Sequence, residues 1–247
     1  MIRRIKKKNI IIAFTIVLLP FILYSCFNLT SVKVGAGGIK NRLEEIDNRW
    51  ESSQEVKNII NNKVFIIGDS RMEYISNREK TIAIPSNFSF IALGGTKIDW
   101  FINDAMVILK DKLDNRKDNI KYHVVFNMGV NDLNDNKDVL IHSDNYFTLY
   151  EKLARMYEDV NFYILSVNPI DMSKINKMIY NQKRTSYKIE TFNNNMVKNL
   201  EIINLKNMKY CDSYYNVDFT TIDGLHYDRT TDQNILDYLT QSCLYYK

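Results

Sequence analysis

The chain has 247 residues, 45% hydrophobic and 25% charged, values that exclude a disordered polymer and leave room for one α/β domain with an appendage. Its formal net charge is +4, but five of the 33 basic residues lie within the first eight positions, and the other 28 nearly balance 29 acidic residues. A body without a basic excess offers no surface that follows a phosphate backbone, so we expect no nucleic-acid partner.

An apolar segment follows the basic cluster at the start of the chain. Residues 10–27 would span about 27 Å as a helix, close to the thickness of a bilayer core. Because basic residues favour the cytoplasmic side, we expect residues 1–27 to be a cytoplasmic segment and a single-pass membrane anchor, with the remaining chain extracytoplasmic. A cleaved signal peptide, which would leave the protein secreted, and lipidation at Cys26 are the alternatives.

The next segment is predicted to connect the anchor to the folded body. Residues 28–39 hold three of the eight glycines in the chain and are typical of a flexible linker. Residues 40–61 place apolar side chains at helical intervals among charged ones, which predicts a helix that packs on the domain or acts as a stem. We therefore divide the rest of the chain into a linker and stem (28–62) and a catalytic domain (63–247).

Apolar runs and helical patterns alternate along that last segment. Runs typical of buried strands occupy residues 64–67, 88–93, 123–128 and 162–167, with a weaker one at 208–210. Helical periodicity occupies residues 99–112, 146–157, 173–200 with a break, and 231–244. This alternation predicts an α/β domain with a parallel sheet covered by helices on both faces.

The first predicted strand ends in Gly68-Asp69-Ser70. Gly68 permits a sharp turn, and Asp69 or Ser70 can cap a helix that begins near Arg71. Open α/β sheets bind ligands beyond the carboxyl ends of their strands, so the Ser70 hydroxyl is a candidate nucleophile and its amide a candidate oxyanion donor. Ordinary turn and cap chemistry is the competing interpretation of the same three residues.

A serine nucleophile needs a base, and the chain has three histidines. His123 lies in a predicted strand, where a core or sheet-face role is expected, and His142 lies in a polar connection without an evident partner. His226 follows Asp223 by three residues, so in a short loop that carboxylate can reach Nδ1 and leave Nε2 for a hydroxyl. Asp228 is a competing partner that spacing alone does not exclude.

Two further strand ends offer hydrogen-bond donors for a developing oxyanion. The second predicted strand runs into Gly94-Gly95, where a bare main-chain amide can approach a ligand. The third ends in Gly129-Val130-Asn131-Asp132, and the Asn131 side-chain NH2 can donate. Each signal alone is typical of a turn or a helix cap, but adjacent strand ends converge on one edge of a sheet.

In this order, the four motifs resemble the blocks of the SGNH (GDSL) hydrolase family, over residues 63–247. The resemblance implies a three-layer α/β/α sandwich with a parallel flavodoxin-like sheet. It also implies Ser70 as nucleophile and oxyanion donor, Gly95 rather than Gly94 as backbone donor, Asn131 as side-chain donor, His226 as base and Asp223 as its partner. Gly-Asp-Ser-Arg together with residues 166–169 resembles a secreted or membrane-anchored branch found in Gram-positive bacteria.

We therefore predict an extracytoplasmic serine esterase that removes O-acyl groups, most simply O-acetyl, from a cell-surface or environmental carbohydrate through an acyl-enzyme. A lipid esterase, an O-acyltransferase with the same residues, and a non-catalytic glycan-binding module are the alternatives. Four residues beside the motifs are candidates for lining the substrate pocket: Tyr74, Trp100, Asn168 and Tyr227. We expect no metal or other cofactor, because no Cys/His cluster has ligand spacing, and Cys211 and Cys243 could pair in an oxidising compartment.

Overall fold

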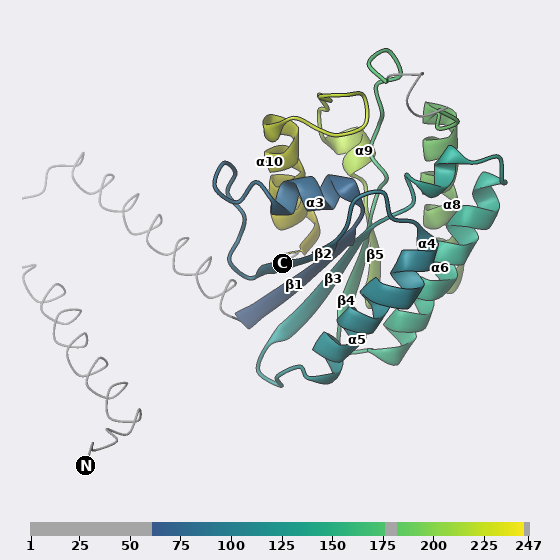
Figure 1. Cartoon of the computed structure of the whole chain (residues 1–247). Coiled ribbons are helices and arrows are strands. Elements are labelled where there is room, and N and C mark those ends of the chain that lie inside the picture. The colour runs from purple at the N-terminus through teal and green to yellow at the C-terminus, as the bar shows by residue number, and fades with distance from the viewer. Residues whose placement is uncertain (1–60, 176–181, 245–247) are drawn as a thin grey trace, which may run out of the picture. The chain divides into compact units, whose positions relative to one another are not determined.

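Five parallel strands form the sheet in this computed structural model, which describes residues 61–175 and 182–244 (Figure 1). Their order is β2-β1-β3-β4-β5, the flavodoxin-like order. The strands are β1 (Asn62–Gly68), β2 (Phe88–Ala92), β3 (Lys121–Asn127), β4 (Asn161–Leu165) and β5 (Met208–Cys211). All five predicted strands are therefore present, and the parallel sheet is confirmed.

Alternate residues of each central strand enter cores on opposite faces of the sheet. In β1, Val64 and Ile66 pack with α3 (Ser70–Ser76) and α10 (Arg229–Tyr238), whereas Phe65 and Ile67 face α5, α6 and α8. These helices are α5 (Met106–Asp114), α6 (Val139–Met156) and α8 (Ser186–Ile203). Burial on both faces explains the unbroken apolar run of this strand, and the two helical layers complete a three-layer sandwich (Figure 1).

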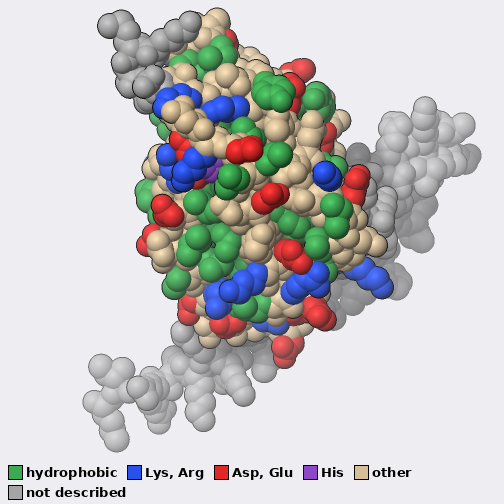
Figure 2. Space-filling model, turned by 90° about the vertical axis from the view of Figure 1, so that its right-hand side faces the viewer, with side chains coloured by type: hydrophobic (Ala, Val, Ile, Leu, Met, Phe, Trp, Pro, Cys, Tyr) green, Lys and Arg blue, Asp and Glu red, His purple; other side chains and the backbone are tan. Residues whose placement is uncertain are grey.

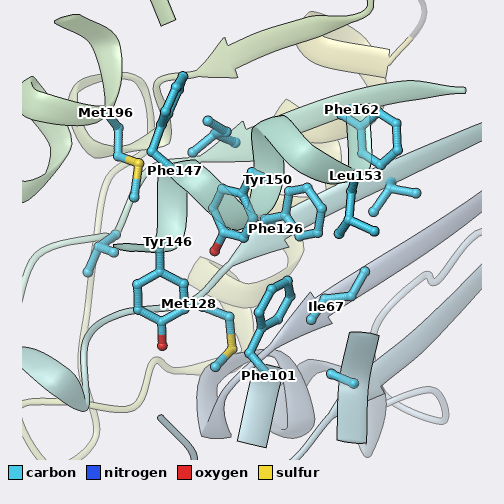
Figure 3. Close-up of a cluster of buried hydrophobic side chains, with 14 of the residues drawn as sticks. Ile67, Phe101, Phe126, Met128, Tyr146, Phe147, Tyr150, Leu153, Phe162 and Met196 are labelled. Carbon is cyan, nitrogen blue, oxygen red and sulfur yellow. The ribbon is translucent and has the colours of Figure 1, made fainter. Parts of the chain in front are cut away.

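Aromatic rings fill the larger core, between the sheet and α5, α6 and α8 (Figure 3). The ring of Phe126, from β3, stacks on that of Tyr150, from α6, with centroids 4.0 Å apart. Phe101 packs edge-on against both rings. Beside them the Tyr146 hydroxyl donates to Asp132 Oδ2 at 2.8 Å, so this core holds in place the turn that follows β3.

Helix boundaries differ from the sequence expectation wherever a cap or a turn decides them. The helix expected at 146–157 begins at Val139, because the Asp138 side chain accepts from the amide of Leu140 and caps it. Within the range expected to be helical with a break, 173–200, the described residues hold a turn at 172–174 and α8, which begins at Ser186 after the cap Thr185.

The other two predicted helices each contain a π-helical stretch. The first runs through α4 (Ile98–Trp100), the π-helical Phe101–Ala105 and α5. The second runs through α10 and the π-helical Leu239–Leu244. Between β5 and α10 lies one more short helix, α9 (Ser213–Asn216).

The predicted membrane anchor (1–27) and almost all of the predicted linker and stem (28–62) lie outside the described residues, as does Cys26. Across residues 61–175 and 182–244, none of the helices has the length and hydrophobicity needed to cross a bilayer.

Charges of both signs are mixed with hydrophobic side chains on the face shown in Figure 2, the side that carries the α5–α6 layer. Exposed apolar residues from these helices include Val107 and Ile108 of α5 and Leu140 and Ile141 of α6. Single exposed apolar side chains among charges are ordinary for a protein surface. The distribution of side chains on this face therefore does not indicate a binding site.

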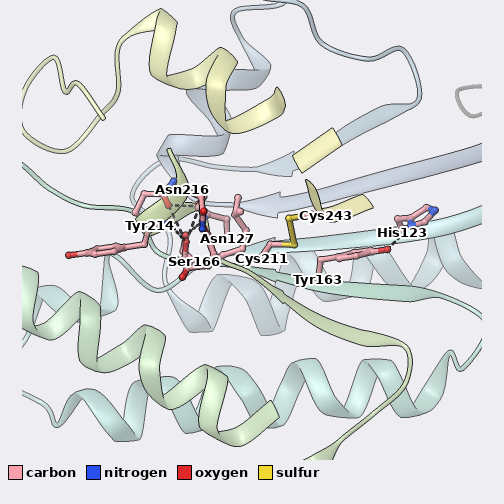
Figure 4. Close-up of a disulfide and its surroundings, with 12 residues drawn as sticks. His123, Asn127, Tyr163, Ser166, Cys211, Tyr214, Asn216 and Cys243 are labelled. Atoms are coloured by element: carbon pink, nitrogen blue, oxygen red, sulfur yellow. Dashed lines mark hydrogen bonds between the residues drawn. A yellow bond between two sulfur atoms is a disulfide. The ribbon is translucent and has the colours of Figure 1, made fainter. Parts of the chain in front are cut away.

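A disulfide joins Cys211, the last residue of β5, to Cys243 in the C-terminal π-helical stretch, with the two Cα atoms 5.9 Å apart (Figure 4). The pairing that the sequence allows is therefore present in the structure. To the right of this link, in the view of Figure 4, His123 lies beside Tyr163.

Candidate active site

Ser70 is the first residue of α3 and follows directly on β1. Asp69 caps the helix, since its Oδ1 accepts from the main-chain amide of Arg71 at 3.1 Å. A side chain at Gly68 would collide with Met72, so the tight strand-to-helix turn requires glycine there. Ser70 is 7% exposed, and its position at a strand end and a helix start agrees with the sequence expectation.

The imidazole of His226 lies between Ser70 and Asp223. Its Nε2 is 2.9 Å from Ser70 Oγ, and its Nδ1 is 2.7 Å from Asp223 Oδ2. Because an ionised carboxylate can only accept, Nδ1 carries the proton and Nε2 accepts from the Ser70 hydroxyl. The chain thus brings together a hydroxyl, a base and a carboxylate that are up to 156 positions apart.

Asp223 also shapes the loop that presents the imidazole. Its Oδ1 accepts from the main-chain amides of Leu225 at 2.9 Å and His226 at 2.7 Å, and Gly224, which separates Asp223 from Leu225, adopts φ 91°. Burial opposes the charge, but these amides and the imidazole hold the pKa of Asp223 below its ordinary value of 3.8. Asp228 instead caps α10 through the amide of Thr231, so Asp223 is the partner of His226.

Tyr74, one turn after Ser70 on α3, packs against the imidazole of His226. Its ring stacks on that of His226 with centroids 4.5 Å apart and planes 13° from parallel. The Arg78 guanidinium lies over the same ring, 5.9 Å from its centroid, and is itself held by Asp232 at 2.6 Å. The ring of Tyr74 is thus packed on the candidate base, and Tyr74 is also one of the residues that line the cavity beside it.

A cavity of about 320 Å³ opens over these residues. It contains Ser70, Asp223 and His226, and also both glycines of the second strand end and Asn131. Sequence reasoning did not single out its other lining residues, which are Glu73, Ile175, Gln182, Arg184 and Leu225. Three strand ends and the loop before α10 thus meet around one hollow, as expected for the carboxyl edge of a parallel sheet.

The expected oxyanion donors border this cavity. Gly95 has φ 71°, a conformation that favours glycine, and a Cβ added there would meet open space. A Cβ added at Gly94 would lie 2.8 Å from Glu73 Oε2 and 3.7 Å from Ser70 Cβ, so a side chain at this position would crowd the Glu73 carboxylate. Asn131, 6% exposed, donates from Nδ2 to the main-chain oxygen of Thr96 at 3.0 Å.

Three residues expected to line the substrate pocket do not border this cavity. Trp100 is partly buried against the larger core. Asn168 is 1% exposed and accepts from the hydroxyls of Ser166 and Ser213; Ser166 is labelled in Figure 4. Tyr227 is also 1% exposed and donates to the main-chain oxygen of Pro169.

Asn168 and Tyr227 instead hold Arg71, the residue that follows the candidate nucleophile. The buried guanidinium of Arg71 donates to the main-chain oxygen of Asn168 at 2.9 Å. It also lies 5.0 Å from the centroid of the Tyr227 ring, an arrangement typical of a cation–π contact. Both residues therefore support α3 from within the domain, where a substrate does not reach.

The remaining two histidines are structural. His123 is buried between the Tyr163 hydroxyl and Asn62 Oδ1, as expected for a sheet-face residue. Burial lowers its pKa from 6.5 to about 4. His142 lies on α6 and not in a connection, and its Nε2 is 2.9 Å from Asp135, a partner that the sequence pattern did not indicate. Among the described residues, no three His, Cys, Asp or Glu side chains gather as metal ligands would.

Comparisons with known proteins find relatives in structure only, since no family model and no curated protein matches the sequence. A Streptococcus pneumonia protein with a proposed identity of platelet activating factor aligns over 85% of this chain and 100% of its own, at 15% identity and a TM-score of 0.59. A member of the lipolytic protein G-D-S-L family from Veillonella parvula aligns over 73% and 97%, at 12% identity and 0.52. The M. smegmatis aryl esterase aligns over 74% and 100%, at 13% identity and 0.53.

The chain shares the fold of these structures. In this fold the strand order places β1 between β2 and β3, so Ser70, Gly95 and Asn131 follow three adjacent strands. His226 and Asp223 reach the same edge from the loop before α10 (Figure 1). This fold therefore presents a hydroxyl, an imidazole and candidate oxyanion donors to one cavity.

Proposed function

We propose that the chain is a serine esterase in which Ser70 is the nucleophile, His226 the general base and Asp223 the group that orients the base. The hydrogen bond between His226 Nε2 and Ser70 Oγ, 2.9 Å long, is the observation that supports this most directly. A glycan-binding module would have no need for a base and an orienting carboxylate beside a serine. The shared fold with lipolytic and esterase structures agrees with this assignment.

In the first step Ser70 Oγ attacks the ester carbonyl carbon while Nε2 takes the hydroxyl proton, and Asp223 stabilises the resulting imidazolium. The carbonyl oxygen becomes an oxyanion that accepts from the amides of Ser70 and Gly95 and from Asn131 Nδ2. When the ester bond breaks, Nε2 gives the proton to the leaving alcohol and Ser70 carries the acyl group.

In the second step Nε2 takes a proton from water, whose oxygen attacks the acyl carbon. When the bond between the acyl carbon and Ser70 Oγ breaks, Nε2 returns that proton to Oγ, and the carboxylic acid leaves. An acyltransferase would differ only in using a sugar hydroxyl in place of this water. The geometry of Ser70, His226 and Asp223 serves both reactions equally.

The substrate class that we propose is an O-acyl carbohydrate, most simply an O-acetyl ester, met outside the cell membrane. Two acceptor groups in the cavity support a polyhydroxylated substrate: the Glu73 carboxylate and Gln182 Oε1, which is buried without a hydrogen-bond partner. Sugar hydroxyls would supply donors to both. The basic cluster and the apolar residues 10–27 support the location.

Labelling with a fluorophosphonate probe and hydrolysis of p-nitrophenyl acetate test the proposed chemistry. The native chain and Ser76→Ala, a control on the same helix, should react, whereas Ser70→Ala should lose both reactions and keep its melting temperature. Undiminished labelling of Ser70→Ala would remove Ser70 as the nucleophile. Glycan binding without any turnover would favour the binding module.

A substrate series then tests the proposed class. Acetylated xylan and acetylated peptidoglycan should be deacetylated, and acetyl esters should be preferred over long-chain acyl esters. Preference for long-chain esters would favour the lipid esterase, and acyl transfer to an added sugar in place of acetate release would favour the transferase.

A further inference from the structure

Both ends of the Asn131 side-chain amide make hydrogen bonds, one to a group that can only accept and one to a group that can only donate. Its Nδ2 donates to the main-chain oxygen of Thr96 at 3.0 Å, and its Oδ1 accepts from Arg184 Nη2 at 2.8 Å. A carbonyl oxygen only accepts, and a guanidinium only donates. A reversed amide would therefore place donor against donor at Arg184 and acceptor against acceptor at Thr96, so its orientation is fixed.

Arg184 is held in place by a second hydrogen bond to the same turn. Its Nε donates to the main-chain oxygen of Val130 at 2.6 Å, so the guanidinium bonds two successive residues of the turn after β3. The residue is 6% exposed and borders the same cavity as Ser70. It enters from the segment before α8, 53 positions away from Asn131.

The bond from Asn131 to Thr96 extends this support to the other expected oxyanion donor. Thr96 follows Gly95 directly, in the turn after β2. Asn131 thus connects the strand end that carries the Gly95 amide to its own strand end. One chain of hydrogen bonds runs from Arg184 through Asn131 to the Gly95 turn.

We infer that Arg184 is a positioning residue for the oxyanion site, a role that rests on the proposed function. Its charge-assisted bond draws electron density toward Asn131 Oδ1, which makes the Nδ2 hydrogens stronger donors to a developing oxyanion. It also holds the distance between the Asn131 and Gly95 donors. Because this gain arises as negative charge develops, its loss should appear in kcat and not in KM.

The test compares Arg184→Ala and Arg184→Lys with the native chain in p-nitrophenyl acetate hydrolysis. Removal of an oxyanion donor costs roughly 10²-fold to 10³-fold in rate, and loss of its support should cost less, about 10-fold to 10²-fold in kcat with KM within about twofold. Arg184→Lys should fall between, since one ammonium cannot reproduce the forked contact with Val130 and Asn131. Arg155→Ala, which removes an exposed arginine of α6 paired with Glu151, is the matched control.

Two readouts separate this role from a merely structural one. Methylguanidinium added to Arg184→Ala should restore part of kcat. In an Asn131→Ala background, Arg184→Ala should cause little further loss, because the residue acts through Asn131. A kcat within twofold of native, an effect confined to KM, a loss without rescue, or full additivity with Asn131→Ala each overturns the inference.

Fluorophosphonate labelling of Ser70 distinguishes failure of this inference from failure of the proposed function. A native chain that does not label overturns both. A native chain that labels, with Arg184→Ala labelled equally fast, overturns the role of Arg184 alone.

Discussion

Replacing Asp223 by asparagine should lower kcat by about 10²-fold to 10³-fold without unfolding the domain. Asp223 accepts three hydrogen bonds, from His226 Nδ1 and from the amides of Leu225 and His226. Asparagine offers only one acceptor oxygen. If that oxygen keeps the two amides, its NH2 faces Nδ1, which drives the imidazole proton to Nε2 and leaves no lone pair for the Ser70 hydroxyl.

The expected magnitude follows from the partly exposed geometry of this pair. A hydrogen bond to a charged group contributes about 1.5–3 kcal/mol. Attraction between the carboxylate and the imidazolium formed in the reaction adds roughly 1–2 kcal/mol at an effective dielectric constant of about 50. That dielectric is appropriate because the Asp223 side chain is 48% exposed, and a buried triad aspartate would give a larger loss.

Steady-state hydrolysis of p-nitrophenyl acetate measures this effect, with Asp228→Asn as the matched control in the same loop. Asp228 caps α10, and asparagine caps helices about as well as aspartate, so this variant should remain within about twofold of native. If Asp223→Asn retained kcat within about fivefold, or if Asp228→Asn lost more, the assignment of Asp223 as the orienting group would be wrong.

Three further predictions concern the stability of the domain and the stacking of Tyr74 on His226. Because the pKa of His123 is about 4 in the fold against 6.5 unfolded, its contribution is present above pH 6.5 and is lost as pH falls toward 4. Urea unfolding of the native chain and of His123→Gln at pH 7 and pH 4.5 should show that the histidine accounts for about 2 kcal/mol of stability lost between these two pH values; an equal change in both chains would refute this. Gly129→Ala should lower the unfolding free energy by about 2–5 kcal/mol in the same assay, since φ is 119° and the new Cβ would lie 2.6 Å from Phe192 Cζ; an unchanged midpoint would refute the steric argument. Tyr74→Ala should reduce kcat about threefold to tenfold, as expected for loss of a ring stack, while Tyr74→Phe stays near native; equal losses would point to the hydroxyl instead.

The sheet could be predicted from sequence because a strand buried on both faces consists of consecutive apolar residues. Residues 64–67 are apolar without interruption, and the glycines and polar residues that end the strands mark the edge where ligands bind. The motifs themselves pointed to Ser70 and His226, whereas the choice of Asp223 over Asp228 came from the family resemblance and not from spacing. The helix start at Val139 was missed because a single cap residue, Asp138, determines it.

Side-chain direction was the information that the sequence lacked. Tyr227 follows His226 directly, but in the extended bridge that it forms with Thr221 successive side chains point to opposite sides, so one enters the cavity and the other the core. Arg184 gave no local signal either. Its contact with Asn131 joins residues 53 positions apart, and only the folded chain brings them together.

The link between Cys211 and Cys243 closes a covalent ring whose two ends are 32 positions apart, and this ring contains both Asp223 and His226. Ser70 lies outside the ring, on the strand-and-helix framework. In a chain-entropy treatment, closing a loop of this length destabilises the unfolded ensemble by about 4 kcal/mol. Reduction by a thiol would therefore lower the free energy of unfolding of the whole domain, and the ring that it opens carries the candidate base and its carboxylate but not the candidate nucleophile.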